Sequence, residues 1–159
     1  MDKYELERIY DLYFEIVYRI CFLYMKNPAD AQDVTQETFC QLIRKTPVFE
    51  SDEKIKAWLI VCASNLCKNQ LKKWWVRKIV AYEDVIGDFR EEMPGADSYI
   101  SDVYRIVMSL DEKYAIPTYL YYYEGYNTFE IAGILSINQS TVQTRLAKAR
   151  KLLRIELEE

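Results

Sequence analysis

The sequence has 159 residues, of which 50% are hydrophobic and 29% are charged, with only 4 glycines and 4 prolines. This composition excludes a collagen-like, rod-like or largely disordered chain and allows one ordinary domain or two small ones. There is no histidine, the commonest general base and metal ligand, so catalytic triads and histidine-ligated zinc sites are not expected. The longest apolar run, Ala57 to Ala63, is too short to span a membrane, and no signal peptide opens the chain. We therefore expect a soluble, cytoplasmic protein.

The charges are unevenly distributed, although the net charge is only −4. Residues 54–78 carry lysines and arginines but no carboxylate, and so do residues 139–155. Between them, residues 81–112 are strongly acidic. This alternation predicts two modules that can each meet phosphate groups, held on an acidic connector that avoids them.

Three amphipathic helices are predicted in the first half of the chain. Apolar residues recur three and four positions apart over residues 4–24, 29–44 and 53–75. The stripe predicted to face inward on the first helix consists of Leu6, Ile9, Tyr10, Tyr13, Val17, Ile20, Cys21 and Tyr24. Asn27-Pro28 and Thr46-Pro47 separate them, because proline disfavours a helical residue before it. Ser51 or Asp52 is a suitable N-cap for the third helix. Four cysteines lie among apolar neighbours without a Cys-x-x-Cys pair, which indicates buried reduced thiols: Cys21, Cys40, Cys62 and Cys67.

The periodicity stops at residues 77–98, which read as an acidic linker. Four shorter helical patterns follow, over residues 99–110, 114–124, 128–135 and 139–157. Tyr119 to Tyr123 would favour a strand on propensity alone, but no strand pattern is convincing, and we interpret these tyrosines as core and interface packing. The predicted fold is all-α, with helical domains at residues 1–76 and 99–159 and the linker between them.

The segment from Thr128 to Leu146 has the layout of a helix-turn-helix. Ala132 is small where the two helices must cross, Ile137 fills the turn, and Asn138 is placed to cap the second helix. We expect four apolar side chains of that helix to face inward: Val142, Leu146, Ala149 and Leu153. Polar and basic side chains then remain on the opposite face: Gln139, Ser140, Thr141, Thr144, Arg145 and Lys148. Such groups can reach base edges and phosphates in a major groove. A helical hairpin with a merely solvated basic face is the alternative, and the absence of carboxylates there disfavours it.

Two blocks of sequence carry a resemblance to a known family. Asp30 to Phe39 (DAQDVTQETF), with Ile55 to Leu59 (IKAWL) and Ala63 to Asn65 (ASN), resembles region 2 of the extracytoplasmic-function sigma factors. Ser140 to Leu153 (STVQTRLAKARKLL) is similar to region 4 of that family. The resemblance covers nearly the whole chain and implies an RNA polymerase sigma factor. It departs at Ser136, where the family usually has glycine in the turn.

The resemblance implies that the second helix docks on the coiled coil of the RNA polymerase β′ subunit. The matching positions are Asp30, Asp33, Gln36 and Glu37. Asp33 and Glu37 are four residues apart and so share one helical face, which suits a basic partner. The alternative for Asp30 and Asp33 is a favourable interaction with the helix dipole, which does not account for Glu37.

The same resemblance implies that the third helix and the loop before it recognise and melt the minus-ten element. Phe49 and Asn65 match positions that form a pocket for a flipped base, with Glu50, Ser51 and Asp52 completing the loop. Lysines on the helix would hold the non-template strand by its phosphates: Lys56, Lys68, Lys72 and Lys73. Trp58 is more consistent with core packing than with a stacking platform. Trp74 and Trp75, at a helix end beside lysines, suit either contact with duplex DNA or packing on the linker.

Residues Gln139 to Lys148 would then lie in the minus-35 major groove, and the acidic linker would thread the polymerase cleft. The implied partners are core RNA polymerase, including its β flap, promoter DNA and an anti-sigma factor, with no cofactor, no metal and no catalysis by the chain itself. Two alternatives stay open. One is a stand-alone helix-turn-helix repressor or activator, which would need a dimer to read two half-sites. The other is an interaction module that sequesters a partner.

Overall fold

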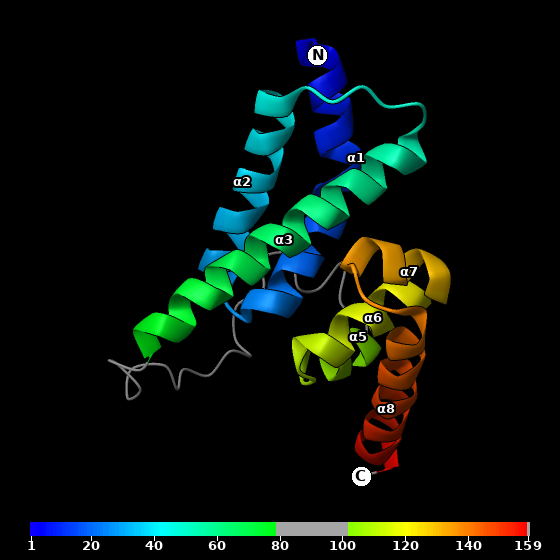
Figure 1. Ribbon diagram of the computed structural model, residues 1–159. Coiled ribbons are helices and arrows are strands. Elements are labelled where there is room, and N and C mark those ends of the chain that lie inside the picture. The colour runs from blue at the N-terminus through cyan, green and yellow to red at the C-terminus, as the bar shows by residue number, and fades with distance from the viewer. Residues whose placement is uncertain (79–101, 159) are drawn as a thin grey trace. The chain divides into compact units, whose positions relative to one another are not determined.

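The computed structural model describes residues 1–78 and 102–158, and every regular element in these ranges is an α-helix (Figure 1). The predicted all-α fold is therefore confirmed for this part of the chain. The chain divides into two compact units, each described here by itself. No helix of the described ranges is both long and apolar enough to cross a membrane.

The first unit contains α1 (Lys3–Met25), α2 (Pro28–Lys45) and α3 (Asp52–Lys78), each packed against the other two (Figure 1). The carboxylate of Asp2 accepts a hydrogen bond of 2.8 Å from the backbone N–H of Glu5 and caps α1. The Asn27 side chain caps α2, whose first residue is proline, as helix N-termini favour. The predicted break at Asn27-Pro28 is confirmed.

The core of the first unit surrounds the C-terminal half of α1. From Val17 to Met25 every residue except Arg19 is buried, so burial extends around the whole helix. This follows because α2 and α3 both pack against α1. The predicted single apolar stripe was too narrow here, and it was wrong about Tyr10, whose side chain is 42% exposed and contacts the ring of Phe39.

Helix boundaries differ from the prediction by a few residues. The third helix continues to Lys78, two residues past the predicted end of the first domain, and residues 79–98 of the predicted linker lie outside the described residues. Of the two predicted N-caps, Ser51 is the one used: its hydroxyl accepts from the backbone N–H of Lys54 at 3.3 Å. The cysteines are all free thiols; Cys21 and Cys67 are buried as predicted, whereas Cys40 and Cys62 are only half-buried.

The second unit contains α5 (Asp102–Met108), α6 (Glu112–Tyr122), α7 (Thr128–Leu135) and α8 (Gln139–Glu158). The predicted helix over residues 114–124 therefore begins two residues earlier and ends two residues earlier. Tyr104 and Tyr119 are fully buried and meet edge to face, with ring centroids 5.9 Å apart. The Tyr119 hydroxyl donates a 2.6 Å hydrogen bond to the Glu124 carboxylate. Core packing thus accounts for Tyr119, whereas Tyr121, Tyr122 and Tyr123 of the same segment are exposed, so the core interpretation was wrong for these three. Tertiary contacts override the strand propensity of this segment.

The α7–α8 pair forms the predicted helix-turn-helix. Asn127 and Glu130 make a reciprocal capping box at the start of α7, a pattern that the sequence analysis missed. At its end Ser136 adopts the left-handed conformation with φ 56° and ψ 45°. The next residue, Ile137, donates its backbone N–H to the carbonyl of Ala132 at 3.1 Å, which closes the turn.

Candidate nucleic-acid interface

The predicted acidic docking face lies on the side of α2 away from α1 and α3. Asp33 and Gln36 are exposed, while Asp30 and Glu37 are half-buried. Buried residues of α2 occupy the other side: Ala31, Val34, Thr35, Thr38, Phe39 and Leu42. Spacings of three and four residues place the four predicted docking residues along one exposed arc of the helix.

Two of these carboxylates have perturbed acidity. Partial burial, with a smaller repulsion from Asp33, raises the pKa of Asp30. Hydrogen bonds from Arg44 at 2.9 Å and Gln41 at 3.1 Å lower the pKa of Glu37. One docking carboxylate is therefore already paired with a cation of its own helix, a contact that the sequence analysis missed.

The apolar side chains of the loop between α2 and α3 differ in how far they are exposed. Thr46 ends α2 in the left-handed region with φ 38°, and the Val48 side chain after it is 97% exposed. Phe49 is half-buried because its ring meets the ring of Trp58 edge to face, with centroids 6.1 Å apart. Trp58 is half-buried as well, so it supports Phe49 from the surface of α3.

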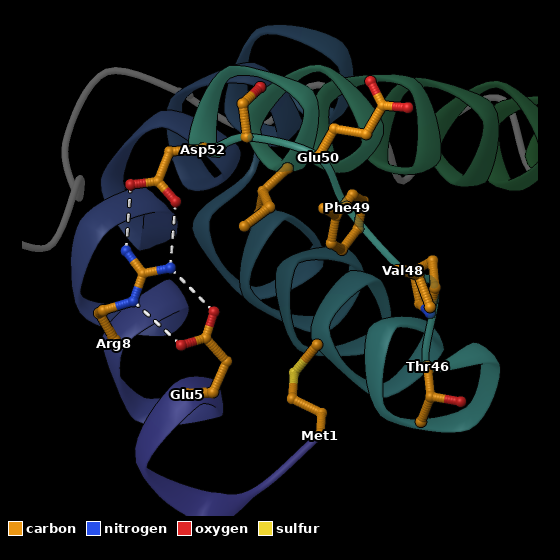
Figure 2. A pocket seen from close by; sticks show the side chains of 11 residues that line it. Met1, Glu5, Arg8, Thr46, Val48, Phe49, Glu50 and Asp52 are labelled. Atoms are coloured by element: carbon orange, nitrogen blue, oxygen red, sulfur yellow. Dashed lines mark hydrogen bonds and ion pairs between the residues drawn. The ribbon is translucent and has the colours of Figure 1, made fainter.

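A pocket of about 410 Å³ opens between this loop and the start of α1 (Figure 2). Its lining includes Phe49, Glu50, Ser51 and Asp52 together with Met1, Glu5, Arg8, Thr46, Pro47, Val48 and Ile55. The structure thus brings the four predicted loop residues to one cavity. Asn65, the fifth predicted member of the base pocket, is not part of this lining.

The Arg8 guanidinium fixes one wall of that pocket (Figure 2). It donates to both oxygens of Asp52 at 3.0 and 3.1 Å and to both oxygens of Glu5 at 2.8 and 3.1 Å. The backbone carbonyl of Asp52 also accepts from the Tyr13 hydroxyl at 3.1 Å. These hydrogen bonds lower the pKa of both carboxyls, which stay ionised near neutral pH. Asp52 therefore anchors the loop to α1.

The exposed face of α3 continues from the loop. Trp58 and Asn65 are seven residues apart, or two helical turns, so Asn65 lies about 10 Å further along the same face. Lys72 follows after two more turns, and Lys68 lies one turn before it on a neighbouring row. Lys56 lies nine residues before Asn65, or two and a half turns, so it is on the opposite side of α3, where it is half-buried. The structure therefore separates Lys56 from the other predicted lysines of α3. Lys73 is exposed and directly follows Lys72.

In the second unit, α8 presents the predicted recognition residues. Of the four side chains predicted to face inward, Val142, Leu146 and Ala149 are buried and Leu153 is half-buried. The polar set on the other side divides by exposure: Gln139, Ser140, Thr144 and Lys148 are exposed, whereas Thr141 and Arg145 are half-buried.

Some of this polar set already bonds within the protein. The Gln139 side-chain amide donates to the Thr128 hydroxyl at 2.8 Å and joins the start of α8 to the start of α7. The Thr144 hydroxyl donates to the Ser140 carbonyl at 2.9 Å, which leaves its lone pairs as acceptors. Asn138 is at the N-cap position, and its carbonyl accepts from the backbone N–H of Val142 at 3.1 Å.

A second pocket of about 410 Å³ lies beside this face. It is lined by Ser140, Thr141, Thr144, Arg145 and Lys148 of α8 and by Lys113 and Tyr114 of α6. Five of the six predicted recognition residues are thus brought together, and Gln139 is the exception. The sequence analysis missed Lys113 and Tyr114, since they lie 32 and 31 residues from Arg145 in the chain and no local pattern links the two segments.

Comparisons with known proteins support both sequence blocks that resemble sigma factors, the region 2 block and the region 4 block. Residues 9–76 match the family model for sigma-70 region 2, and residues 100–153 match that for sigma-70 region 4. The chain is 30% identical to the RNA polymerase sigma factor SigV of Bacillus subtilis, over 88% of this chain and 83% of that protein. It is 26% identical to the extracytoplasmic-function RNA polymerase sigma factor SigW of the same organism, over 94% of this chain and 87% of that protein.

A solved structure shares the fold. The sigma factor RpoE from Bartonella quintana, crystallised with the anti-sigma factor NepR, matches with a TM-score of 0.78 and 20% identity, over 97% of each chain. Region 2 therefore precedes region 4 in this chain. The chain belongs to the extracytoplasmic-function sigma factors of the sigma-70 family.

Proposed function

We propose that the protein is a promoter-specificity subunit of bacterial RNA polymerase. It joins core polymerase, directs it to promoters with two sequence elements, and helps to open the DNA at the minus-ten element. The observation that carries the proposal is the presence of region 2 and region 4 on one chain, each with a polar surface of the matching chemistry. The chain performs no catalysis itself, since phosphodiester synthesis belongs to the polymerase, and it acts in the cytoplasm, where the chromosome lies.

Docking on core polymerase is assigned to the acidic face of α2. Asp33 and Gln36 are exposed there, and Asp30 and Glu37 flank them. Carboxylates on one arc of a helix suit the basic side chains of the β′ coiled coil, and the β flap is the expected partner of the second unit. Because the structural relative was crystallised with an anti-sigma factor, we expect such a protein to hold this chain inactive as well.

Promoter opening is assigned to the loop before α3. Stacking of one base on an aromatic ring is worth on the order of 1–3 kcal/mol, which is similar to the cost of unstacking it from the duplex. Phe49, braced by Trp58, supplies such a ring at the edge of a pocket with polar walls. Asn65 reads or holds a base two turns further along α3, and Lys68, Lys72 and Lys73 hold the strand that leaves it. Lys56 lies on the opposite side of α3 and does not belong to this set.

Recognition of the minus-35 element is assigned to α8. Ser140, Thr141 and Thr144 offer hydroxyl groups, and Arg145 and Lys148 offer cations, on the face that borders the second pocket. Such groups bind base edges and phosphates in a major groove. Gln139 acts differently, because its amide is engaged with Thr128 and so orients the start of the helix.

The experiment is a reconstitution with purified core polymerase on a pool of promoter fragments. Phe49→Ala is expected to block opening without weakening closed binding, and Arg145→Ala to weaken closed binding. Tyr4→Ala, an exposed aromatic on α1 with 83% exposure, and Arg105→Ala, an exposed cation on α5, are the matched controls. If the chain binds DNA as a dimer and never associates with core polymerase, the stand-alone helix-turn-helix regulator replaces this proposal.

A further inference from the structure

The start of α6 lies beside the recognition helix α8, and its side chains belong to neither of the two proposed DNA-binding surfaces. Lys113 and Tyr114 form one wall of the second pocket, and five residues of α8 form the other. The two helices pack against each other, so the wall is fixed by the fold of the second unit. Any ligand that lies on this face of α8 will therefore also meet α6.

The chemistry of the pocket is that of an anion site. Its seven lining residues include three cations, Lys113, Arg145 and Lys148, and four side chains that carry hydroxyl groups. None of the seven is a carboxylate, although Asp111 and Glu112 directly precede Lys113 in the chain. Within the described residues the three cations make no ion pair with an acidic side chain. Their charge is thus available to a partner.

Tyr114 restrains the lysine of this wall. The Lys113 ammonium lies 5.0 Å from the centroid of the half-buried Tyr114 ring, within the range of a cation–π interaction. Such a contact limits the rotamers of a long side chain, so less side-chain entropy is lost when the lysine binds a ligand. The ring also leaves the ammonium's other donors free to face the pocket.

We propose that Lys113 binds the phosphate backbone of duplex DNA lying against α8, with Tyr114 as its positioning residue. This inference rests on the proposed function, because it needs promoter DNA at α8, and it adds a second helix to the interface. The contact is to a phosphate and not to a base edge, so it strengthens binding to every sequence alike. In a salt titration each phosphate contact contributes about 0.9 to the slope of log affinity against log salt concentration.

The test uses the full chain assembled with core polymerase, on a promoter fragment selected from the pool and on the same fragment with its minus-35 element scrambled. Lys113→Gln is expected to lower the affinity for both fragments about five-fold at 0.15 M salt and to reduce the salt slope by about 0.9. Arg105→Gln, which removes an exposed cation of α5, is the charge-matched control and should change neither quantity. An unchanged slope for Lys113→Gln, or a loss confined to the selected sequence, would overturn the proposal.

A second comparison tests the role of Tyr114. Tyr114→Phe keeps the ring and should retain the salt slope, whereas Tyr114→Leu should lose part of it. In the Tyr114→Leu background, Lys113→Gln should then have a smaller effect than it has in the parent; an undiminished effect refutes the positioning role. Arg145→Ala distinguishes a failure of the Lys113 contact from a failure of DNA binding by α8. If it weakens closed binding while Lys113→Gln does not, only the inference about α6 fails; if neither weakens it, the assignment of α8 to the minus-35 element fails.

Discussion

Replacing Ser136 by glycine is expected to stabilise the helix-turn-helix. Ser136 ends α7 with φ 56° and ψ 45°, a left-handed conformation in which its Cβ crowds the backbone. That conformation costs a residue with a Cβ about 1–2 kcal/mol. Glycine avoids this cost but loses about 0.5–1 kcal/mol more conformational entropy on folding. The net stabilisation should be about 0.5–1 kcal/mol.

A reciprocal substitution exists in the same unit. Gly125 follows α6 with φ 75°, so this turn, like the turn at Ser136, contains a residue in the left-handed conformation. The N–H of the next residue, Tyr126, donates to the Leu120 carbonyl at 3.0 Å and closes the turn. No described heavy atom lies within 4 Å of the Cβ that alanine would add, so only the backbone conformation opposes it. Gly125→Ala should therefore destabilise the unit by about 1 kcal/mol.

Amide hydrogen exchange followed by mass spectrometry on peptides from α6 to α8 measures both effects. A change of about 1 kcal/mol in local opening alters the exchange rate roughly five-fold, slower for Ser136→Gly and faster for Gly125→Ala. Gly133→Ala is the control, because Gly133 is helical and has open space around it; it should slow exchange through helix propensity alone. Faster exchange in Ser136→Gly, or no change in Gly125→Ala, would show that the left-handed conformation does not limit the stability of these turns.

Three further outcomes are expected. Hydrogen bonds hold the pKa of Glu37 below its ordinary value of 4.5, so the ionised carboxylate stabilises the folded state. Glu37→Gln should therefore lower the unfolding free energy at pH 7, measured by urea titration. The difference from the parent should vanish as the pH falls below 4.5, because the carboxylate of the parent is then protonated. Arg44→Gln frees the Glu37 carboxylate and should raise the association rate with core polymerase at low salt, measured by stopped-flow fluorescence; an unchanged rate would remove Glu37 from the docking face. Tyr119→Phe removes the hydrogen bond to Glu124 and should destabilise the second unit by about 1.5 kcal/mol, measured by thermal unfolding. An unchanged unfolding free energy would mean that water replaces this hydrogen bond without loss in the unfolded chain.

Sequence reasoning succeeded where a structural feature depends on residues close together in the chain. The break at Asn27-Pro28 and the limits of the helix Thr128–Leu135 follow from local backbone preferences. The inward side of α8 follows from a 3.6-residue period, so Val142, Leu146 and Ala149 are buried as predicted. The pattern failed at Tyr10 and along the second half of α1, since a helix packed by two neighbours buries more than one face.

In the candidate sites, too, some features follow from the local sequence and others only from the packing of separate helices. Residue types and their spacing determined by themselves that the chain is helical, that α2 carries an acidic face and that α8 carries a polar, basic one. Only the tertiary structure decided that Asp52 is clamped by Arg8 from 44 positions away and that Lys113 and Arg145 line one pocket. The physical reason is that periodicity and charge are local properties of a helix, whereas the partner that a side chain meets depends on how separate helices pack.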